Sequence, residues 1–184
     1  MTTLSAKNQE QLLIQRLMQV PLFEKMSSRH LHLMLQLGQS KQVAADESLW
    51  LEGDSSRGLY ILLVGQVEIL VSGERIEQIE PVRSLGEIAL LGGQPHYEEA
   101  VCVAQCTLLE IPAPVFMHVL QRNSEICQRI CRNAVGIVSG QLQQSNNDVG
   151  ALGESCRQIE EKIVESERHA NDMNMVRQMR GGGA

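Results

Sequence analysis

The amino-acid sequence predicts a mainly β fold: an antiparallel β-barrel or jelly roll that follows N-terminal helices and precedes a long C-terminal coiled-coil helix. Apolar residues recur at helical spacing near the N-terminus, short β-type runs alternate with turn residues from 40 to 111, and helical spacing returns after Pro112. We therefore expect N-terminal helices over 1–38, a barrel with an internal short helix over 39–113, C-terminal helices with a dimerising coiled coil over 114–180, and a flexible tail over 181–184.

Two helices are expected before the barrel. Leucines at helical spacing precede Pro21, which interrupts the first run. A second helix is expected to begin at an N-cap formed by Ser27 or Ser28 and to end at Gly38. The residues that this second helix is expected to turn inward are Leu31, Met34 and Leu35.

Turn residues divide the barrel region into short runs, as is typical of antiparallel strands. Residues 59–64 are apolar throughout, and their length and flanking glycines favour a central strand over a helical turn. Residues 67–71 and 101–104 alternate as half-buried strands do, and Ser72-Gly73 suits a tight hairpin turn.

The C-terminal region shows a heptad pattern from Val135 onward, interrupted by two serines. This pattern predicts a coiled coil, and a second copy of the chain in a two-fold homodimer is its simplest partner. The alternative is an intrachain hairpin with the helix folded back on the barrel. Gly150 and Gly153 favour a bend near the middle. The residues predicted to form the dimer seam are Val135, Val138, Leu142, Val149, Leu152, Cys156, Ile159 and Ile163.

The composition excludes several classes of partner. A formal charge of −6 argues against a nucleic-acid partner or an anionic membrane surface, because such surfaces need clustered Lys and Arg. The polar N-terminus lacks the pattern of a secretory signal, and no run is long and apolar enough for a membrane span. Five cysteines without a disulfide framework indicate reduced thiols. We expect a cytoplasmic protein that binds neither nucleic acid nor membrane.

Three segments carry a family resemblance: "LWLEGDSSRGLYILLVGQVEILV", "LGEIALLGGQP" and "CTLLEIP". Gly53, Asp54, Tyr60, Gly65 and Val67 have the spacing of the family's landmarks. Over residues 21–140 the sequence resembles a cyclic-nucleotide-binding domain, as found in the catabolite activator family, cyclic-AMP-dependent kinase regulatory subunits and gated channels. The resemblance implies a β-barrel whose short internal helix helps to hold a cyclic nucleotide.

The resemblance also implies a ligand site over residues 86–99. Gly86 and Glu87 open the short helix, Glu87 has the place of the acid that binds the ribose hydroxyl, and the amides of Ile88 and Ala89 are expected to face the phosphate. The family's phosphate-binding arginine is replaced by His96, and its threonine or serine is replaced by Glu99.

These replacements predict a degenerate phosphate-binding cassette, with Glu98 and Glu99 adding negative charge where a phosphate would lie. Nucleotide binding is expected to be weak or absent, so no cofactor is assigned, although a cyclic nucleotide or related ligand stays open. A sharper alternative is that His96 is protonated in the field of Glu98 and Glu99, and that the rebuilt pocket accepts a cationic or neutral ligand.

No other motif predicts catalysis or a metal site. Neither Cys102-x3-Cys106 nor Cys127-x3-Cys131 has a common zinc or iron–sulfur spacing, so buried structural thiols are expected. The residues after Gly153 continue the heptads and leave no room for the helix-turn-helix domain of the family's transcription factors. We therefore expect a non-enzymatic signalling or scaffold protein that dimerises and acts through an unidentified protein partner. The alternative is a ligand sensor that relays binding through its long C-terminal helix.

Overall fold

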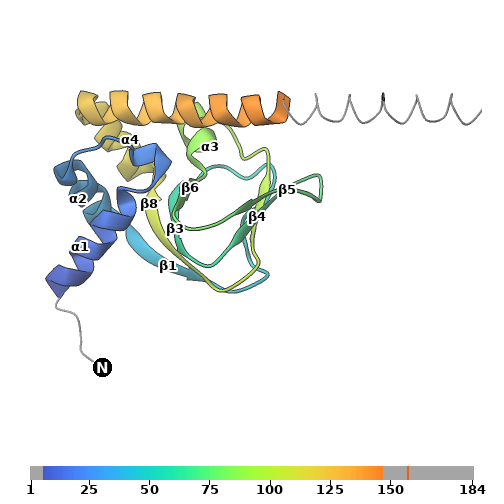
Figure 1. Ribbon diagram of the computed structural model, residues 1–184, viewed down its shortest axis with the longest axis horizontal. Coiled ribbons are helices and arrows are strands. Elements are labelled where there is room, and N and C mark those ends of the chain that lie inside the picture. Colours follow the sequence, from blue (N-terminus) through green and yellow to red (C-terminus); the bar gives the residue numbers. More distant parts are fainter. Residues whose placement is uncertain (1–5, 147–156, 158–184) are drawn as a thin grey trace, which may run out of the picture. The chain divides into compact units, whose positions relative to one another are not determined.

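The computed structural model describes residues 6–146 and residue 157, and it combines two antiparallel sheets with helices (Figure 1). The helical elements up to residue 122 are α1 (Ala6–Leu17), the 3-10 turn η1 (Pro21–Phe23), α2 (Ser28–Leu37), α3 (Glu87–Gly92) and α4 (Ala113–Arg122). Residues 124–146 are also helical.

Eight strands form a jelly roll of two four-stranded sheets. The first sheet has the order β1-β8-β3-β6 and consists of β1 (Gln39–Val43), β8 (Cys106–Pro112), β3 (Gly58–Val64) and β6 (Arg83–Leu85). The second sheet has the order β2-β7-β4-β5 and consists of β2 (Ser48–Trp50), β7 (Glu99–Cys102), β4 (Val67–Val71) and β5 (Glu74–Ile79).

Strand β3 is the central strand that the apolar run predicted, and it is buried on both of its faces. Leu59 and Ile61 point to a helix-covered core, whereas Tyr60 and Leu62 point to the interior between the sheets. Successive side chains of a strand alternate between faces, so a strand with two buried faces requires an uninterrupted apolar run. This burial explains why residues 59–64 lack the polar alternation of an edge strand.

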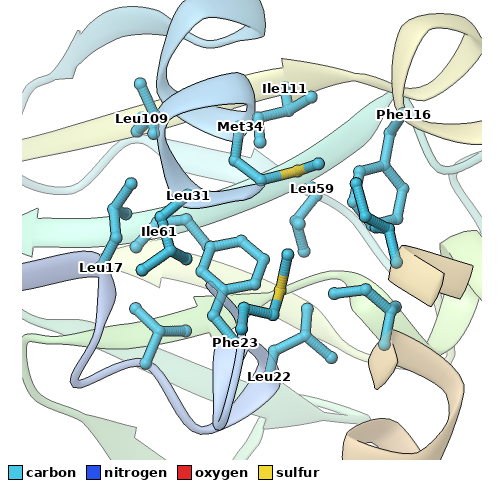
Figure 2. Packing of buried hydrophobic residues seen from close by; sticks show 14 of the residues in the cluster. Leu17, Leu22, Phe23, Leu31, Met34, Leu59, Ile61, Leu109, Ile111 and Phe116 are labelled. Carbon is cyan, nitrogen blue, oxygen red and sulfur yellow. The ribbon is translucent and has the colours of Figure 1, made fainter. Parts of the chain in front are cut away.

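Helices α1, α2 and α4 cover the outer face of the first sheet (Figure 1). Figure 2 shows Leu31 and Met34 of α2 close to Ile61 of β3, with Phe23 beside them and Phe116 of α4 nearby. Burying large apolar side chains contributes about 1.5–3 kcal/mol for each one, so this cluster fixes the helices on the sheet.

The expected start and end of α2 are confirmed in the structure. Ser27 is the N-cap, and its hydroxyl accepts a hydrogen bond from the amide of His30 at 3.3 Å. Gly38 is the C-cap, and its amide donates to the carbonyl groups of Met34 and Leu35. The expected hairpin turn is also present, because Ser72 and Gly73 both have positive φ between β4 and β5.

Strand β7 is shorter than the alternation over residues 101–104 predicted. The strand ends at Cys102, and its inward residues are Ala100 and Cys102, while Val101 is half-buried on the other face. Small side chains fit here because Trp50 and Tyr60 fill the neighbouring interior. The alternation was correctly anticipated, but it does not extend through residues 103 and 104.

The C-terminal helix begins inside the first compact unit, which ends at Ile137. Ile126 and Ile130 are fully buried in the helix-covered core. Beyond them, Val135 and Leu142 expose 69% and 61% of their surface, and Val138 is half-buried. The other seam residues, Val149, Leu152, Cys156, Ile159 and Ile163, and the tail over 181–184 lie outside the described residues.

Candidate ligand site at the start of the short helix

The turn from β6 into α3 depends on a glycine. Gly86 has φ 79° and ψ 2°, a left-handed conformation that residues with a Cβ rarely adopt. A Cβ atom there would lie 3.3 Å from the carbonyl oxygen of Gly58 and 3.4 Å from Cε1 of His96. The turn starts α3 at Glu87, so the amides of Ile88 and Ala89 lie in the first helical turn, where they lack acceptors within the helix.

Glu87 is a buried acid with one unsatisfied oxygen. Its side chain is 7% exposed, and its Oε2 atom has no hydrogen-bond partner. Burial raises the pKa of Glu87, although its own backbone amide, the Ser84 hydroxyl and the nearby charge of Arg83 favour the ionised form. Burial therefore outweighs these contacts, and the carboxyl group keeps its proton to a higher pH than a solvated glutamate does.

Glu98 is a second acid of the same kind, and the two influence each other. Its Oε2 atom is also buried without a partner. Burial raises the pKa of Glu98, the charge of Glu87 raises it further, and a hydrogen bond with Tyr97 opposes both effects. The structure thus brings together Glu87 and Glu98, two predicted site residues that are eleven positions apart in the chain.

His96 lies in the protein interior rather than in the field of the glutamates. Its side chain is 2% exposed, and its ring stacks on Trp50 with centroids 4.1 Å apart and 17° between the planes. Its backbone is held by two hydrogen bonds of 2.8 Å, from its amide to the carbonyl of Asp54 and from the amide of Gly53 to its own carbonyl.

The hypothesis of a protonated His96 is wrong. Burial lowers the pKa of His96, and the charge of Asp54 only partly offsets this effect. The imidazole is therefore neutral at pH 7, and its Nδ1 atom is buried without a hydrogen-bond partner. A neutral, stacked ring lacks the charge with which an arginine binds phosphate.

Glu99 is the first residue of strand β7, whereas Glu98 lies in the bend just before the strand. The Oε1 atom of Glu99 accepts a hydrogen bond of 2.7 Å from the hydroxyl of Ser48 on strand β2. Its neighbour Ala100 faces the interior, so alternation turns Glu99 away from it. Of the two adjacent glutamates, the structure places Glu98 with Glu87 and leaves Glu99 with Ser48.

The sequence reasoning missed three contributors to this site. Trp50 provides the stacking surface for His96, Ser84 hydrogen-bonds with Glu87, and Tyr97 hydrogen-bonds with Glu98. Trp50 is the chain's one tryptophan, and its position in the apolar run before Gly53 was a usable signal. Ser84 and Tyr97 carry no such signal, because only the folded turn brings them to the acids.

A comparison with known proteins identifies the kind of domain that contains these residues. Residues 40–123 match the family model of the cyclic nucleotide-binding domain, and this range includes both sheets and the turn at Gly86. The chain carries a cyclic nucleotide-binding domain. Residues 86–99, for which the resemblance implies a ligand site, lie within the matched range.

Relatives of the cyclic nucleotide-binding family agree with this fold. A cAMP-dependent protein kinase regulatory subunit from Yarrowia lipolytica is 27% identical over 99 residues, which are 54% of this chain and 26% of that protein. The regulatory domain of Toxoplasma gondii PKA, determined with cAMP, gives a TM-score of 0.57 at 27% identity over 64% of this chain and 47% of that chain. The catabolite activator protein of Thermus thermophilus gives 0.60 at 20% identity over 72% and 63%.

Four cysteines lie among the described residues, and they are free thiols. Cys102 and Cys106 are free and buried. The pKa of Cys102 is raised to about 12, mainly by burial and to a smaller extent by the neighbouring Cys106. Cys127 is free and half-buried, and Cys131 is free and exposed, which differs from the expected burial of that second pair. Within the described ranges, no three His, Cys, Asp or Glu side chains are grouped to hold a metal ion. None of the helices that the structure describes combines the length and apolarity needed to cross a bilayer.

Proposed function

We infer that this chain is a non-enzymatic regulatory protein whose nucleotide pocket disfavours cyclic nucleotides and whose C-terminal helix forms a homodimer that acts through a protein partner. The observation that carries this proposal is the chemistry of the cassette. Where the family binds phosphate with an arginine, this domain has a buried neutral imidazole and an unsatisfied carboxyl group of Glu98.

The magnitudes support weak nucleotide binding. A hydrogen bond to a charged group contributes about 1.5–3 kcal/mol, and the loss of the arginine removes such a bond. A carboxylate about 4 Å from a phosphate charge adds roughly 1 kcal/mol of repulsion in water and about 4 kcal/mol at an effective dielectric of 20. Together they reduce affinity by on the order of 3–6 kcal/mol, which takes a ligand of about 1 μM to about 1 mM or weaker.

A thermal-shift experiment with cAMP and cGMP tests this part of the proposal. At 1 mM ligand, a dissociation constant near 1 mM stabilises the protein by about 0.4 kcal/mol, or roughly 1–2 °C. A dissociation constant near 1 μM would stabilise it by about 4 kcal/mol, or roughly 8–16 °C. We expect the small shift, and the large one would refute the proposal.

The exposed apolar residues of the C-terminal helix support the homodimer. Val135 and Leu142 are seven residues apart, so they lie on the same stripe of a helix, and both are largely exposed in the single chain. Each exposed leucine or valine that a second copy covers gains about 1.5–3 kcal/mol from the loss of contact with water.

Light scattering of the intact chain tests this pairing. The chain mass is 20.4 kDa, and we expect about twice that mass in solution. Leu142→Glu should weaken the dimer at least about tenfold, because it brings a charge into an apolar seam. The matched control Gln143→Glu adds the same charge one residue away at an exposed position and should leave the mass unchanged. A monomeric natural chain would contradict the dimer.

A second candidate function is a ligand sensor, and one observation favours it. Two carboxyl oxygens in the nucleotide pocket are buried without partners, and buried polar atoms of this kind normally have one. A ligand that donated hydrogen bonds to these oxygens would change the stability of helix α3. Reversal of a ligand-dependent shift by Glu87→Ala would support the sensor, whereas a silent ligand panel would favour the scaffold.

A further inference from the structure

Two cysteines lie four residues apart in the helix of residues 124–146. Residues at this spacing are neighbours on one face of a helix, with Cβ atoms about 5–6 Å apart. Both thiols are free, and Cys127 is half-buried whereas Cys131 is exposed to solvent. The two side chains are also close enough to hydrogen-bond with each other. Cys127 and Cys131 therefore form a dithiol that a ligand can reach from solvent without entering a cavity.

The helical segment that carries this dithiol is held firmly by its neighbours. At its start, the Oδ1 atom of Asn123 accepts a hydrogen bond of 3.0 Å from the amide of Ile126. After the dithiol, the Nδ2 atom of Asn133 donates a hydrogen bond of 2.9 Å to the carbonyl oxygen of Leu22. Between these two contacts, Ile130 is fully buried in the helix-covered core. The backbone thus keeps the two sulfur atoms on one face before any ligand arrives.

The other described pair, Cys102 and Cys106, has the same sequence spacing but a different setting. Both side chains are fully buried among the residues between the sheets. The thiol of Cys106 already donates to the carbonyl groups of Gln66 and Ala104, at 3.4 Å and 3.3 Å. This pair is closed to solvent and suits a structural role, so among the four described cysteines the helical pair is the one open to an external ligand.

The geometry of the helical pair selects among the reactions open to two thiols. A disulfide needs Cβ atoms about 3.5–4.5 Å apart, which is closer than an undistorted helix places residues at this spacing. A peroxide sensor needs a stabilised thiolate, but burial, and then the neighbouring Cys127, raises the pKa of Cys131. Structural zinc needs four ligands, and among the described residues no three His, Cys, Asp or Glu side chains are grouped. A single soft ion inserted between the two sulfur atoms has none of these conflicts.

We propose that Cys127 and Cys131 bind one Cu(I) ion per chain through both of their sulfur atoms. Cu(I) is a soft ion that selects thiolate ligands and is satisfied by two of them. In this ligand exchange two S–H bonds break, two Cu–S bonds form and two protons are released, while copper stays in its +1 state. Both cysteines precede Val135, where the predicted dimer seam begins, so binding requires neither the homodimer nor the nucleotide pocket.

Anaerobic titration of the intact chain with Cu(I) tests the proposal, with bicinchoninate as the competing chelator and ascorbate as a thiol-free reductant. The absorbance of the copper–bicinchoninate complex measures how much Cu(I) the protein withholds, and we expect one ion per chain. Cys127→Ser and Cys131→Ser should each weaken Cu(I) binding at least about tenfold, because one thiolate ligand is lost. Cys156→Ser removes a thiol elsewhere in the sequence and is the matched control, so it should leave the stoichiometry and affinity unchanged.

The natural protein provides a second readout that does not depend on variants folding. X-ray absorption at the copper edge counts the ligands of the bound ion, and we expect two sulfur ligands. Zn²⁺ at the same concentration should not displace the Cu(I), because two thiolates leave zinc short of ligands. Four results would each overturn the proposal: no Cu(I) withheld from the chelator, one ion per two chains, three or more sulfur ligands, or weakening by Cys156→Ser as large as by the other two variants.

Discussion

Removal of the Glu98 carboxylate should improve the binding of cyclic nucleotides, because the proposed function assigns this acid as a negative group that opposes the phosphate. The variant is Glu98→Ala, and the ligand is cAMP. Glu98 is half-buried, and its charge interacts with that of Glu87 inside the site. Under the proposed function, a bound cyclic phosphate would experience the charge of Glu98.

The size of the gain follows from the electrostatics of a half-buried pair. Repulsion between unit charges about 4 Å apart is roughly 1 kcal/mol in water and about 4 kcal/mol at a dielectric of 20. These limits correspond to an affinity gain between about fivefold and several hundredfold. Half burial moves Glu98 away from the aqueous limit, so we expect a gain of at least about tenfold. The missing arginine still keeps the variant weaker than a member with an intact cassette.

Competition by cAMP against a fluorescent cyclic-nucleotide analogue measures this gain at pH 8, where ionised Glu98 opposes the phosphate most. Glu99→Ala is the control, because it removes an equal charge from the adjacent residue, whose carboxylate accepts a hydrogen bond from Ser48. It should change the affinity less than about twofold. Equal effects of the two variants, or no effect of Glu98→Ala, would refute the assignment of Glu98 as the group that opposes phosphate.

The remaining predictions concern stability. Glu87→Gln should raise the melting temperature at pH 7–8 relative to the natural protein, and the difference should vanish towards pH 4. Burial raises the folded-state pKa of Glu87 above its ordinary value of 4.5. The folded protein therefore binds more protons than the unfolded chain between 4.5 and the folded-state pKa, and it loses stability as pH rises through that range. A constant difference across pH would contradict this. Ile61→Ala should cost about 2–5 kcal/mol in urea unfolding, because Ile61 is fully buried in the helix-covered core, whereas Leu12→Ala at a half-exposed position should cost much less. Similar costs for the two would argue against that core. Ser27→Ala should cost about 1 kcal/mol by loss of the cap on α2, measured in the same way, and no change would mean that the cap does not stabilise α2.

Local chemistry made much of the fold predictable. The uninterrupted apolar run at 59–64 indicated a strand with two buried faces, and β3 has them. Serine before a helix and glycine after it marked the ends of α2. Glycine before an acid and a short apolar run marked the turn into α3. In each case the residue type itself is what the backbone or the burial requires.

The orientation of the site residues was less accessible to sequence reasoning. Glu98 and Glu99 are adjacent residues of the same type, so no sequence pattern shows which of them interacts with Glu87. Burial lowers the pKa of His96, and its buried ring stacks on Trp50, which is forty-six positions earlier in the chain. Long-range packing, rather than local spacing, therefore sets the charge of the cassette.

The most direct test of the central claim is isothermal titration calorimetry of the intact chain with cAMP at pH 7. The proposal is that a neutral His96 and the carboxyl group of Glu98 weaken the binding of a cyclic phosphate. We predict a dissociation constant of about 1 mM or weaker. A saturable complex with a dissociation constant near 1 μM would contradict it.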